Sequence, residues 1–458
     1  MNARRQANKQ VPIDMGLRIS QAERKTWVSI ALVRAGAMFS APTLMVGAAL
    51  GIGMALSGAA LAVLCGYGFV VLYMSFIAMQ ASDLGLPTAI LTAPSLGKAG
   101  ARYLVALIVG IVTIGWFGVQ TAVCGSSLSF MLNDVFGISL APQICSVLLG
   151  ILMLVTAVIG FDGLKWISTI AAPLLMAVCI YGVGYALLSS GSTEVLFGYV
   201  APAQDAIGFI AGVHMAIGLY AFAGCTAGDF ARFAPTRKAA VLSTVLGVLP
   251  AGFIALMAAA ALAIVTGIDD VAVLMNSIGL PLVGLIALVL SAWTVNAGNV
   301  YSAGLGFAVM LGQDESGSKL TTLVSGIVGI VLAVVGILDQ FQTWLSVLSA
   351  IAPAMAGVMI ADYWIIRKAN PNNFQACEGV SLVGVAALVA GMLCALLTSG
   401  TFAVITGLAW LDFSFFIAPV NGLVIAIVVY VMAYKLSGQM SYLGSVCIKT
   451  PEQTECER

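Results

Sequence analysis

Hydrophobic residues run along this chain in long blocks that short polar segments separate. A helix crosses the hydrocarbon core of a bilayer with about 20 apolar residues. Blocks of that length predict twelve membrane spans, numbered here in chain order, at residues 27–52, 58–81, 101–131, 141–160, 165–189, 205–228, 239–266, 280–311, 319–338, 342–366, 381–399 and 411–435. The chain is therefore predicted to be an all-α membrane protein. Its transmembrane domain covers residues 27–436, between a polar arm at residues 1–26 and a tail at residues 437–458.

Charged residues in the loops predict the orientation of these spans. When the N-terminus is placed in the cytoplasm, the loops on the far side hold acidic residues and no Lys or Arg. Basic residues concentrate in the cytoplasmic loops of membrane proteins, as the positive-inside rule describes. We therefore expect a multi-pass protein of the cell inner membrane with both termini in the cytoplasm. The cytoplasmic basic residues are then Lys98, Arg102, Lys165, Arg232, Arg237, Lys238, Lys319, Arg367, Lys368, Lys435 and Lys449.

Composition narrows the class of protein further. Hydrophobic residues make up 61% of the chain and charged residues 8%, with a mean hydropathy of +1.08, whereas soluble domains carry about 25% charged residues. The formal net charge is zero, so nucleic acid is not indicated as a partner. The 9 Cys show no metal-ligand spacing, and one His without clustered carboxylates argues against a membrane-embedded enzyme. The polar first 26 residues predict no cleavable signal peptide, and nothing indicates an oligomeric state.

Two spans contain residues that interrupt helices. Span 1 contains Pro42, which lacks a backbone donor, and span 6 contains Gly218 and Gly224 on either side of five residues. The two spans are offset by five, an odd number, so the second set of spans runs upside down relative to the first. This pattern predicts a five-plus-five inverted repeat with broken helices 1 and 6. The repeats cover about residues 27–189 and 205–366, with two extra helices at about residues 381–435.

Span 3 supplies the candidate substrate-binding residues. Trp116 lies in mid-span rather than at the membrane interface, and Gln120 follows four residues later on the same helical face. A flat ring and an amide suit a planar heterocycle that bears C=O and N–H groups. Tyr220, inside the predicted span 6 interruption, is a candidate second aromatic face. Packing between helices would account for the same residues, so both interpretations stay open.

Span 8 holds further polar residues at membrane depth. Asn296 and Asn299 need hydrogen-bond partners there, so they either bind substrate or join helices. The hydroxyl of Thr294 is a candidate ligand for a small cation, together with backbone carbonyl groups freed in span 1.

Two ionisable residues within the spans are candidates for a charge or proton role. Arg34 is the only basic residue well inside a span, and intramembrane charge indicates function by default. Snorkelling to the cytoplasm, or pairing with Asp229 or Asp362, would account for it equally well. His214 is the only His, and it is either a proton carrier or a hydrogen-bonded core residue.

Four motifs resemble nucleobase–cation symporter family 1, which includes cytosine permeases and their hydantoin, allantoin and uracil relatives. They are Gly-Trp-Phe-Gly-Val-Gln at 115–120, Gly-Asp-Phe-Ala-Arg-Phe at 228–233, Tyr-Ser-Ala-Gly-Leu-Gly-Phe-Ala at 301–308 and Ile-Ala-Asp-Tyr-Trp at 360–364. The resemblance covers about residues 27–370. It implies a twelve-helix, inverted-repeat carrier that imports a planar heterocycle, such as a pyrimidine, purine, hydantoin or allantoin, by alternating access. An amino-acid or other small-solute carrier of the same fold is the alternative.

The resemblance also implies roles for individual residues in substrate binding. Trp116 and Tyr220 would sandwich the ring, and Gln120 would hydrogen-bond to it. This chain departs from the cytosine permeases at three positions, where they carry a Gln before the span 3 Trp and two Ser beside the span 6 aromatic residue. Those positions hold Thr113, Leu219 and Phe222. A pyrimidine, purine or ureide ring other than cytosine is therefore at least as well indicated.

A sodium site is the second implication of the resemblance. The corresponding positions are Gly36, Ser40, Ser291, Thr294 and Val295. Val295 replaces a hydroxyl ligand, so coupling to Na⁺, coupling to H⁺ and uncoupled transport all stay open. One hypothesis is that Arg34 or His214 partly replaces the ion. No other cofactor is indicated.

Overall fold

The computed structural model describes residues 18–159, 164–190, 194–268, 273–274, 281–313, 315–376 and 378–437. Most of the predicted N-terminal arm and the predicted tail fall outside these residues. Within them the regular structure is helical, and no β-strand occurs there. The prediction of an all-α protein is confirmed in this coarse form.

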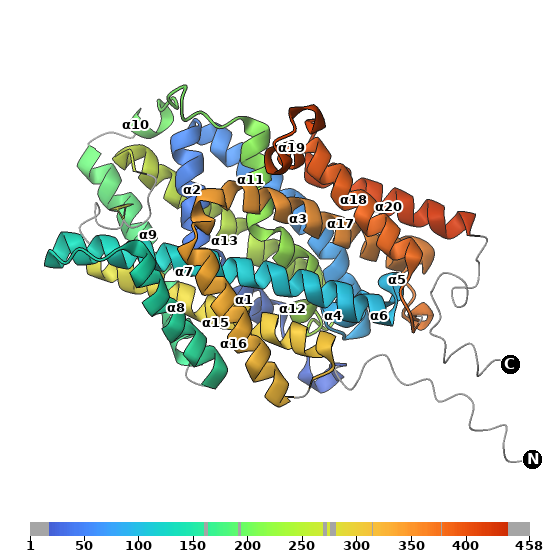
Figure 1. Ribbon diagram of the computed structural model, residues 1–458. Coiled ribbons are helices and arrows are strands. Elements are labelled where there is room, and N and C mark those ends of the chain that lie inside the picture. The colour runs from blue at the N-terminus through green and yellow to red at the C-terminus, as the bar shows by residue number, and fades with distance from the viewer. Residues whose placement is uncertain are drawn as a thin grey trace, which may run out of the picture.

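The helices follow the predicted hydrophobic blocks (Figure 1). Short 3₁₀ turns lie at Gln21–Glu23, Ile337–Gln340, Pro371–Asn373 and Ala409–Leu411, and π-helical turns lie at Ala101–Val105 and Ala361–Ile366. The α-helices are α1 (Trp27–Met38), α2 (Ala41–Gly53), α3 (Leu56–Leu84), α4 (Thr88–Leu91), α5 (Ala93–Leu96), α6 (Lys98–Gly100), α7 (Ala106–Phe136), α8 (Pro142–Ile159), α9 (Leu164–Ser190), α10 (Glu194–Phe197), α11 (Phe209–Cys225), α12 (Gly228–Ala231), α13 (Arg237–Thr266), α15 (Pro281–Leu311), α16 (Glu315–Val334), α17 (Phe341–Ile360), α18 (Leu382–Thr398), α19 (Thr401–Thr406) and α20 (Ala418–Leu436).

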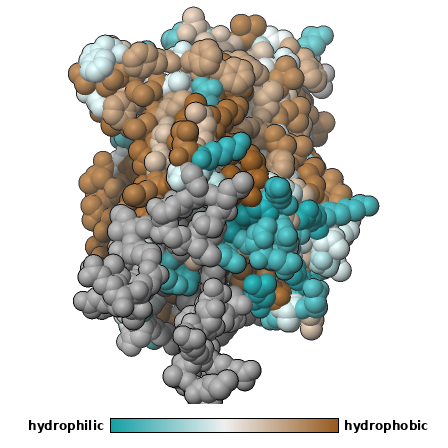
Figure 2. Space-filling model, turned by 90° about the vertical axis from the view of Figure 1, so that its right-hand side faces the viewer, coloured by the Kyte–Doolittle hydropathy of each residue, from teal (hydrophilic) through white to brown (hydrophobic). Residues whose placement is uncertain are grey.

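The described part of the chain contains eight helices that are long and apolar enough to cross a membrane, or nine when the bent pair α1 and α2 counts as one span. Shorter apolar helices lie at Pro173–Tyr185, Phe209–Cys225 and Leu382–Thr398. Large hydrophobic side chains such as Leu72 and Ile180 are exposed on the outside, as lipid-facing residues are. Figure 2 shows hydrophilic residues gathered in one region of the face that it presents, while hydrophobic residues dominate much of the remaining described surface. The protein is therefore a multi-pass membrane protein.

A sharp bend separates α1 from α2. The two helix axes differ by 60°, and Phe39 and Ser40 stand between them with non-helical backbone. Pro42 lies in the first turn of α2, where a missing N–H costs no helical hydrogen bond and a φ near −65° is already suitable. The sequence thus ends one helix and starts the next at this point.

The interruption predicted at Gly218–Gly224 is wrong. Helix α11 continues through both glycines to Cys225, and α12 begins only at Gly228. The two glycines serve close packing instead. A Cβ atom on Gly218 would lie 2.3 Å from the carbonyl oxygen of Leu345, and one on Gly224 would lie 2.6 Å from the hydroxyl of Tyr73.

Helices α2 and α13 also pack through glycine. Gly47 and Gly51 lie one turn apart on α2, in the Gly-x-x-x-Gly spacing that lets membrane helices approach closely. A Cβ atom on Gly47 would lie 2.5 Å from the carbonyl oxygen of Leu256, and one on Gly51 would lie 2.4 Å from that of Ala260. The backbones of the two helices are therefore in direct contact.

The helices form two groups, which α9 connects by packing against both α13 and α15. In one group, α13 packs against α1, α2 and α3, and α11 packs against α3. In the other group, α7 packs against α8, α15 and α16. Helix α17 contacts α11 of the first group, and the C-terminal helices α18 and α20 pack together against α17. The two C-terminal helices thus lie at the edge of the bundle (Figure 1).

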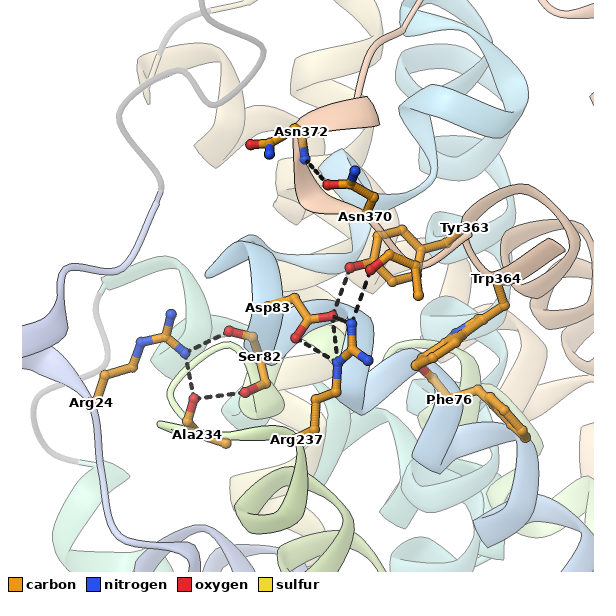
Figure 3. Close-up of polar contacts among 11 residues, drawn as sticks. Arg24, Phe76, Ser82, Asp83, Ala234, Arg237, Tyr363, Trp364, Asn370 and Asn372 are labelled. Atoms are coloured by element: carbon orange, nitrogen blue, oxygen red, sulfur yellow. Dashed lines mark hydrogen bonds and ion pairs between the residues drawn. The ribbon is translucent and has the colours of Figure 1, made fainter. Parts of the chain in front are cut away.

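A polar network ties the ends of three helical segments together (Figure 3). The Asp83 carboxylate at the end of α3 accepts hydrogen bonds from Nε of Arg237 at 2.8 and 2.9 Å and from the Tyr363 hydroxyl at 2.7 Å. The guanidinium of Arg237 also lies 5.1 Å from the ring centre of Trp364. Nearby, Arg24 donates to the carbonyl groups of Ser82 and Ala234. The described end of the N-terminal arm is thereby held against α3 and the segment before α13.

We predict that Gly51→Ala lowers the melting temperature of the purified protein. Its Cβ would press on the α13 backbone, and overpacking of this kind costs about 1–3 kcal/mol. Thermal unfolding in detergent measures the effect. Gly68→Ala is the matched control, because a Cβ there meets nothing within 4 Å and Ala favours a helix over Gly by about 1 kcal/mol. An unchanged melting temperature for Gly51→Ala would contradict the contact.

Candidate functional site

Trp116 is the one residue in the middle of α7 that keeps accessible surface. Between residues 112 and 125 every other residue is buried, whereas Trp116 is half-buried. Its indole meets the ring of Phe341, the first residue of α17, edge to face, with 6.4 Å between the ring centres. The remaining indole surface is therefore available to a ligand, as a stacking residue requires.

Gln120 lies one turn further along α7 and carries an unsatisfied acceptor. Its side chain is 2% exposed, and Oε1 has no hydrogen-bond partner among the described residues. A buried polar atom without a partner costs about 1–3 kcal/mol, which a ligand N–H would recover. The hydroxyl of Thr113, one turn before Trp116, is already used, because it donates to the carbonyl of Val109 at 2.7 Å.

Tyr220, Leu219 and Phe222 lie on α11 and are half-buried, whereas Ala221 between them is fully buried. The Tyr220 ring lies 6.1 Å from the ring of Tyr67, centre to centre, at a tilt of 59°. These three α11 side chains thus retain surface for a ligand, although the helix is unbroken there.

The start of α17 contacts both α7 and α11, which sequence analysis did not foresee. A Cβ atom on Gly115 would lie 2.3 Å from the Trp344 indole, and Leu345 makes the contact with Gly218 described above. Nε1 of Trp344 has no hydrogen-bond partner among the described residues. Only Gly115, directly before Trp116, indicated this contact in the sequence. The Trp344 ring can approach α7 closely there because glycine has no side chain.

The bend between α1 and α2 lies against α15. The hydroxyl of Ser291 donates to the carbonyl oxygen of Phe39 at 3.1 Å. The Gly36 carbonyl accepts from the backbone N–H of Phe39 at 3.3 Å. Of the carbonyl groups in span 1, the one that faces α15 thus belongs to Phe39, a residue that the sequence analysis did not single out.

The other predicted cation ligands lie near this bend. The hydroxyl of Thr294 donates to the carbonyl of Ser291 at 2.9 Å, and the Ser40 hydroxyl lies 3.0 Å from that of Thr43. Within the described residues, no three His, Cys, Asp or Glu side chains could hold a metal ion together. A cation at the bend would therefore be bound by carbonyl and hydroxyl oxygens, which are the ligand types that hard cations prefer.

Asn296 joins helices. Its side chain is fully buried, and Nδ2 donates to the carbonyl of Phe117 at 3.1 Å and to the hydroxyl of Thr121 at 3.0 Å. Asn299 donates to Oδ1 of Asn296 at 3.4 Å. Of the two interpretations left open for these residues, the geometry favours the joining of α15 to α7.

His214 accepts a hydrogen bond at Nε2 from the backbone N–H of Ala418 at 3.2 Å. Ala418 is the first residue of α20, and N–H groups in a first helical turn have no partner within the helix. The imidazole thus caps α20 from α11, as a hydrogen-bonded core residue does.

Arg34 stays inside the bundle and does not snorkel. It is 3% exposed and donates to the carbonyl of Ala227, between α11 and α12, at 3.2 Å. Asp362, one of its predicted partners, instead forms an ion pair with Arg367 at 2.6 Å. Arg34 thus contacts the α11–α12 junction rather than α15.

Comparisons with known proteins place the chain among permeases. A family model described as permease for cytosine/purines, uracil, thiamine and allantoin matches residues 18–417. The cytosine permease of Escherichia coli is 31% identical over 354 residues, which cover 76% of this chain and 80% of that protein. The allantoin permease of Bacillus subtilis is 26% identical over 316 residues, which cover 62% of this chain and 64% of that one.

A solved structure shows the same fold. The inward-facing conformation of Mhp1 superposes with a TM-score of 0.79 and covers 94% of this chain and 95% of that chain. Sequence identity is 18%, so this likeness concerns the fold alone.

We predict that Asn296→Ala lowers the melting temperature of the protein without ligand. The substitution removes two buried hydrogen bonds between α15 and α7 and leaves the Phe117 and Thr121 groups without them, at a cost of about 1–3 kcal/mol. Asn299→Ala is the control, because it loses one long contact and we expect a much smaller change. Weakened ligand binding with an unchanged melting temperature for Asn296→Ala would contradict the joining role.

Proposed function

This chain belongs to the family of permeases for cytosine, purines, uracil, thiamine and allantoin, and from that premise we propose how it carries its substrate. It is a transporter of the nucleobase type and not an enzyme. We infer that it imports a planar heterocycle across the cytoplasmic membrane by alternating access, with both termini in the cytoplasm. The distribution of basic loop residues supports this orientation.

The proposed architecture has twelve spans in a five-plus-five inverted repeat. Nine apolar spans, with α1 and α2 taken as one, and three shorter apolar helices together supply the twelve. The 60° bend between α1 and α2 supports an interruption in span 1. In span 6 the corresponding interruption would lie at Thr226 and Ala227, between α11 and α12, rather than at the glycines. The edge position of α18 and α20 supports two extra helices outside the repeat.

The proposed substrate site lies between α7 and α11. Trp116 and Tyr220 would stack on the two faces of the ring, with Leu219 and Phe222 beside it. Gln120 would accept a hydrogen bond from a ring N–H. The observation that carries this site is the unpartnered Oε1 of Gln120, one turn from the only accessible side chain in the middle of α7. Thr113 would line the proposed site without a hydrogen bond to the ring, since its hydroxyl is bonded within its own helix.

The proposed coupling ion is Na⁺, bound at the bend between α1 and α2. The Phe39 carbonyl has left the helical hydrogen-bond pattern, and the Ser291 hydroxyl already lies against it. Thr294, Gly36 and Ser40 lie next to these groups along the chain and would complete the set of oxygen ligands. Bound there, the ion would bring positive charge between the two helix groups and link α1 to α15.

We predict that Trp116→Ala and Gln120→Ala each abolish stabilisation of the purified protein by its ligand. A thermal-shift screen against nucleobases, hydantoins and allantoin identifies the ligand first. The Trp116→Ala protein loses stacking, worth on the order of 1 kcal/mol beyond burial, and the Gln120→Ala protein loses the acceptor.

The control for this screen is Trp293→Phe, because the Trp293 indole N–H bonds to the Thr156 hydroxyl of α8 at 2.9 Å, and α8 carries none of the proposed ring contacts. The unliganded variants should unfold close to the wild-type temperature. An undiminished ligand shift in both site variants would refute the proposed pocket.

We predict that uptake of the same compound into proteoliposomes depends on Na⁺, and that Ser291→Ala raises the Na⁺ concentration needed for half-maximal uptake by about tenfold. The reason is the loss of one hydroxyl ligand at the bend, which is worth on the order of 1 kcal/mol. Uptake at saturating Na⁺ should recover. Full uptake in Na⁺-free buffer under a proton gradient would instead assign the coupling to H⁺ and overturn the sodium site.

A further inference from the structure

Arg34 carries a positive charge in the apolar interior of the bundle. An arginine keeps its proton in proteins, and this one is 3% exposed. Nη2 donates to the Ala227 carbonyl at 3.2 Å, Nη1 approaches the sulfur of Met74 at 3.6 Å, and the guanidinium lies 5.7 Å from the ring centre of Phe230. Nε has no hydrogen-bond partner among the described residues. The side chain thus has weak neutral contacts and an unused donor.

No carboxylate in the described part of the chain forms an ion pair with Arg34 within 4.0 Å. Both carboxylate oxygens of Asp362 are engaged, because Oδ2 accepts from Arg367 and Oδ1 accepts from the Tyr430 hydroxyl at 2.8 Å. Asp229 accepts from the backbone N–H of Thr88 at 2.9 Å and acts on Arg34 only at longer range. A buried charge without a close counter-charge is unfavourable, and Asp229 offsets this one only from a distance, so an anionic group brought by a ligand would be favoured beside the guanidinium.

Tyr220 places this charge beside the proposed substrate ring. Arg34 lies beside the same part of α3 and α11 as Tyr220, because its contact Met74 follows Tyr73, whose hydroxyl donates to the carbonyl of Ala221, the residue after Tyr220. The Tyr220 ring is the proposed stacking face on α11. A ring stacked on Tyr220 would therefore lie near Arg34. The contacts of Arg34 with Met74 on α3 and Ala227 next to α12 also direct it away from Ser291 on α15. Arg34 and the proposed Na⁺ site therefore have different neighbouring helices.

We propose that Arg34 binds an acidic group of the substrate. The transported compound is then a planar heterocycle that carries a carboxylate or a deprotonated ring nitrogen. This inference rests on the proposed function, because it assumes that the ring stacks on Tyr220. Charge-assisted hydrogen bonds from a guanidinium to an oxyanion are stronger than neutral ones and often involve two N–H groups at once. Nε and the two Nη groups of Arg34 provide such a fork.

The test compares matched pairs of probes on the full-length purified protein near neutral pH. The pairs are uracil with uracil-6-carboxylate, and hydantoin with hydantoin-5-acetate. Dissociation constants are measured for the wild type and for Arg34→Gln. In at least one pair we expect the acidic probe to bind about tenfold more tightly than its neutral parent. Arg34→Gln should abolish that preference, because it weakens binding of the acidic probe about tenfold more than binding of its neutral parent.

Two further variants serve as controls. Arg34→Lys keeps the charge and should retain a preference for the acidic probe. If Arg34→Gln does not fold, Arg34→Met, which also removes the charge, replaces it as the test. Arg102→Gln removes an exposed arginine at the start of span 3 and should leave both affinities unchanged.

The outcomes separate this inference from the proposed function. Neutral parents that bind more tightly than both acidic probes to the wild type, or an acid preference that survives in Arg34→Gln, would overturn the role of Arg34. If Trp116→Ala abolishes binding of a neutral ring in the same experiment, the proposed site stands even though the inference fails. Binding of none of the four probes, and of no ring in the wider screen, would overturn both.

Discussion

Backbone carbonyl groups that leave a helix inside an apolar bundle need hydrogen-bond partners. The rest of this structure depends on which groups supply these partners at the bend between α1 and α2. Lipid offers no hydrogen bonds, so non-helical backbone is tolerated only where protein or ligand covers it. The Phe39 carbonyl meets the Ser291 hydroxyl of α15. This contact requires α15 to lie beside the bend, and it brings hydroxyl and carbonyl oxygens together at the proposed cation site.

Close approach of helix backbones positions the remaining parts of the site. Gly51 sets α2 directly on α13, and Gly115 and Gly218 let the start of α17 contact α7 and α11. Where backbones touch, larger side chains have no room and are displaced to the neighbouring faces. Trp116 and Tyr220 stand on such faces, one residue and two residues from these glycines. The packing of small residues thus determines where flat side chains keep surface for a ligand.

Polar groups in the bundle differ in whether they have a hydrogen-bond partner. The side chains of Asn296, His214 and Asp362 have partners and hold helices together. The Gln120 Oε1 atom and the Arg34 Nε atom lack them. A membrane protein tolerates such unpartnered groups only if something compensates for the cost, because each unsatisfied buried group opposes folding by about 1–3 kcal/mol. The proposed substrate would supply partners for both groups.

The sequence by itself determined the membrane class, the approximate helix positions and the family resemblance. These are local properties, since about 20 consecutive residues decide whether a segment enters lipid. It also placed Trp116 and Gln120 on one helical face. Only the tertiary structure decided that α11 runs unbroken through its glycines, that Phe39 rather than Ser40 presents its carbonyl to α15, that Asn296 joins helices, and that Trp344 meets Gly115. Each of these depends on a partner far along the chain, as with Phe39 and Ser291, which are 252 positions apart, and hydropathy carries no information about such pairs.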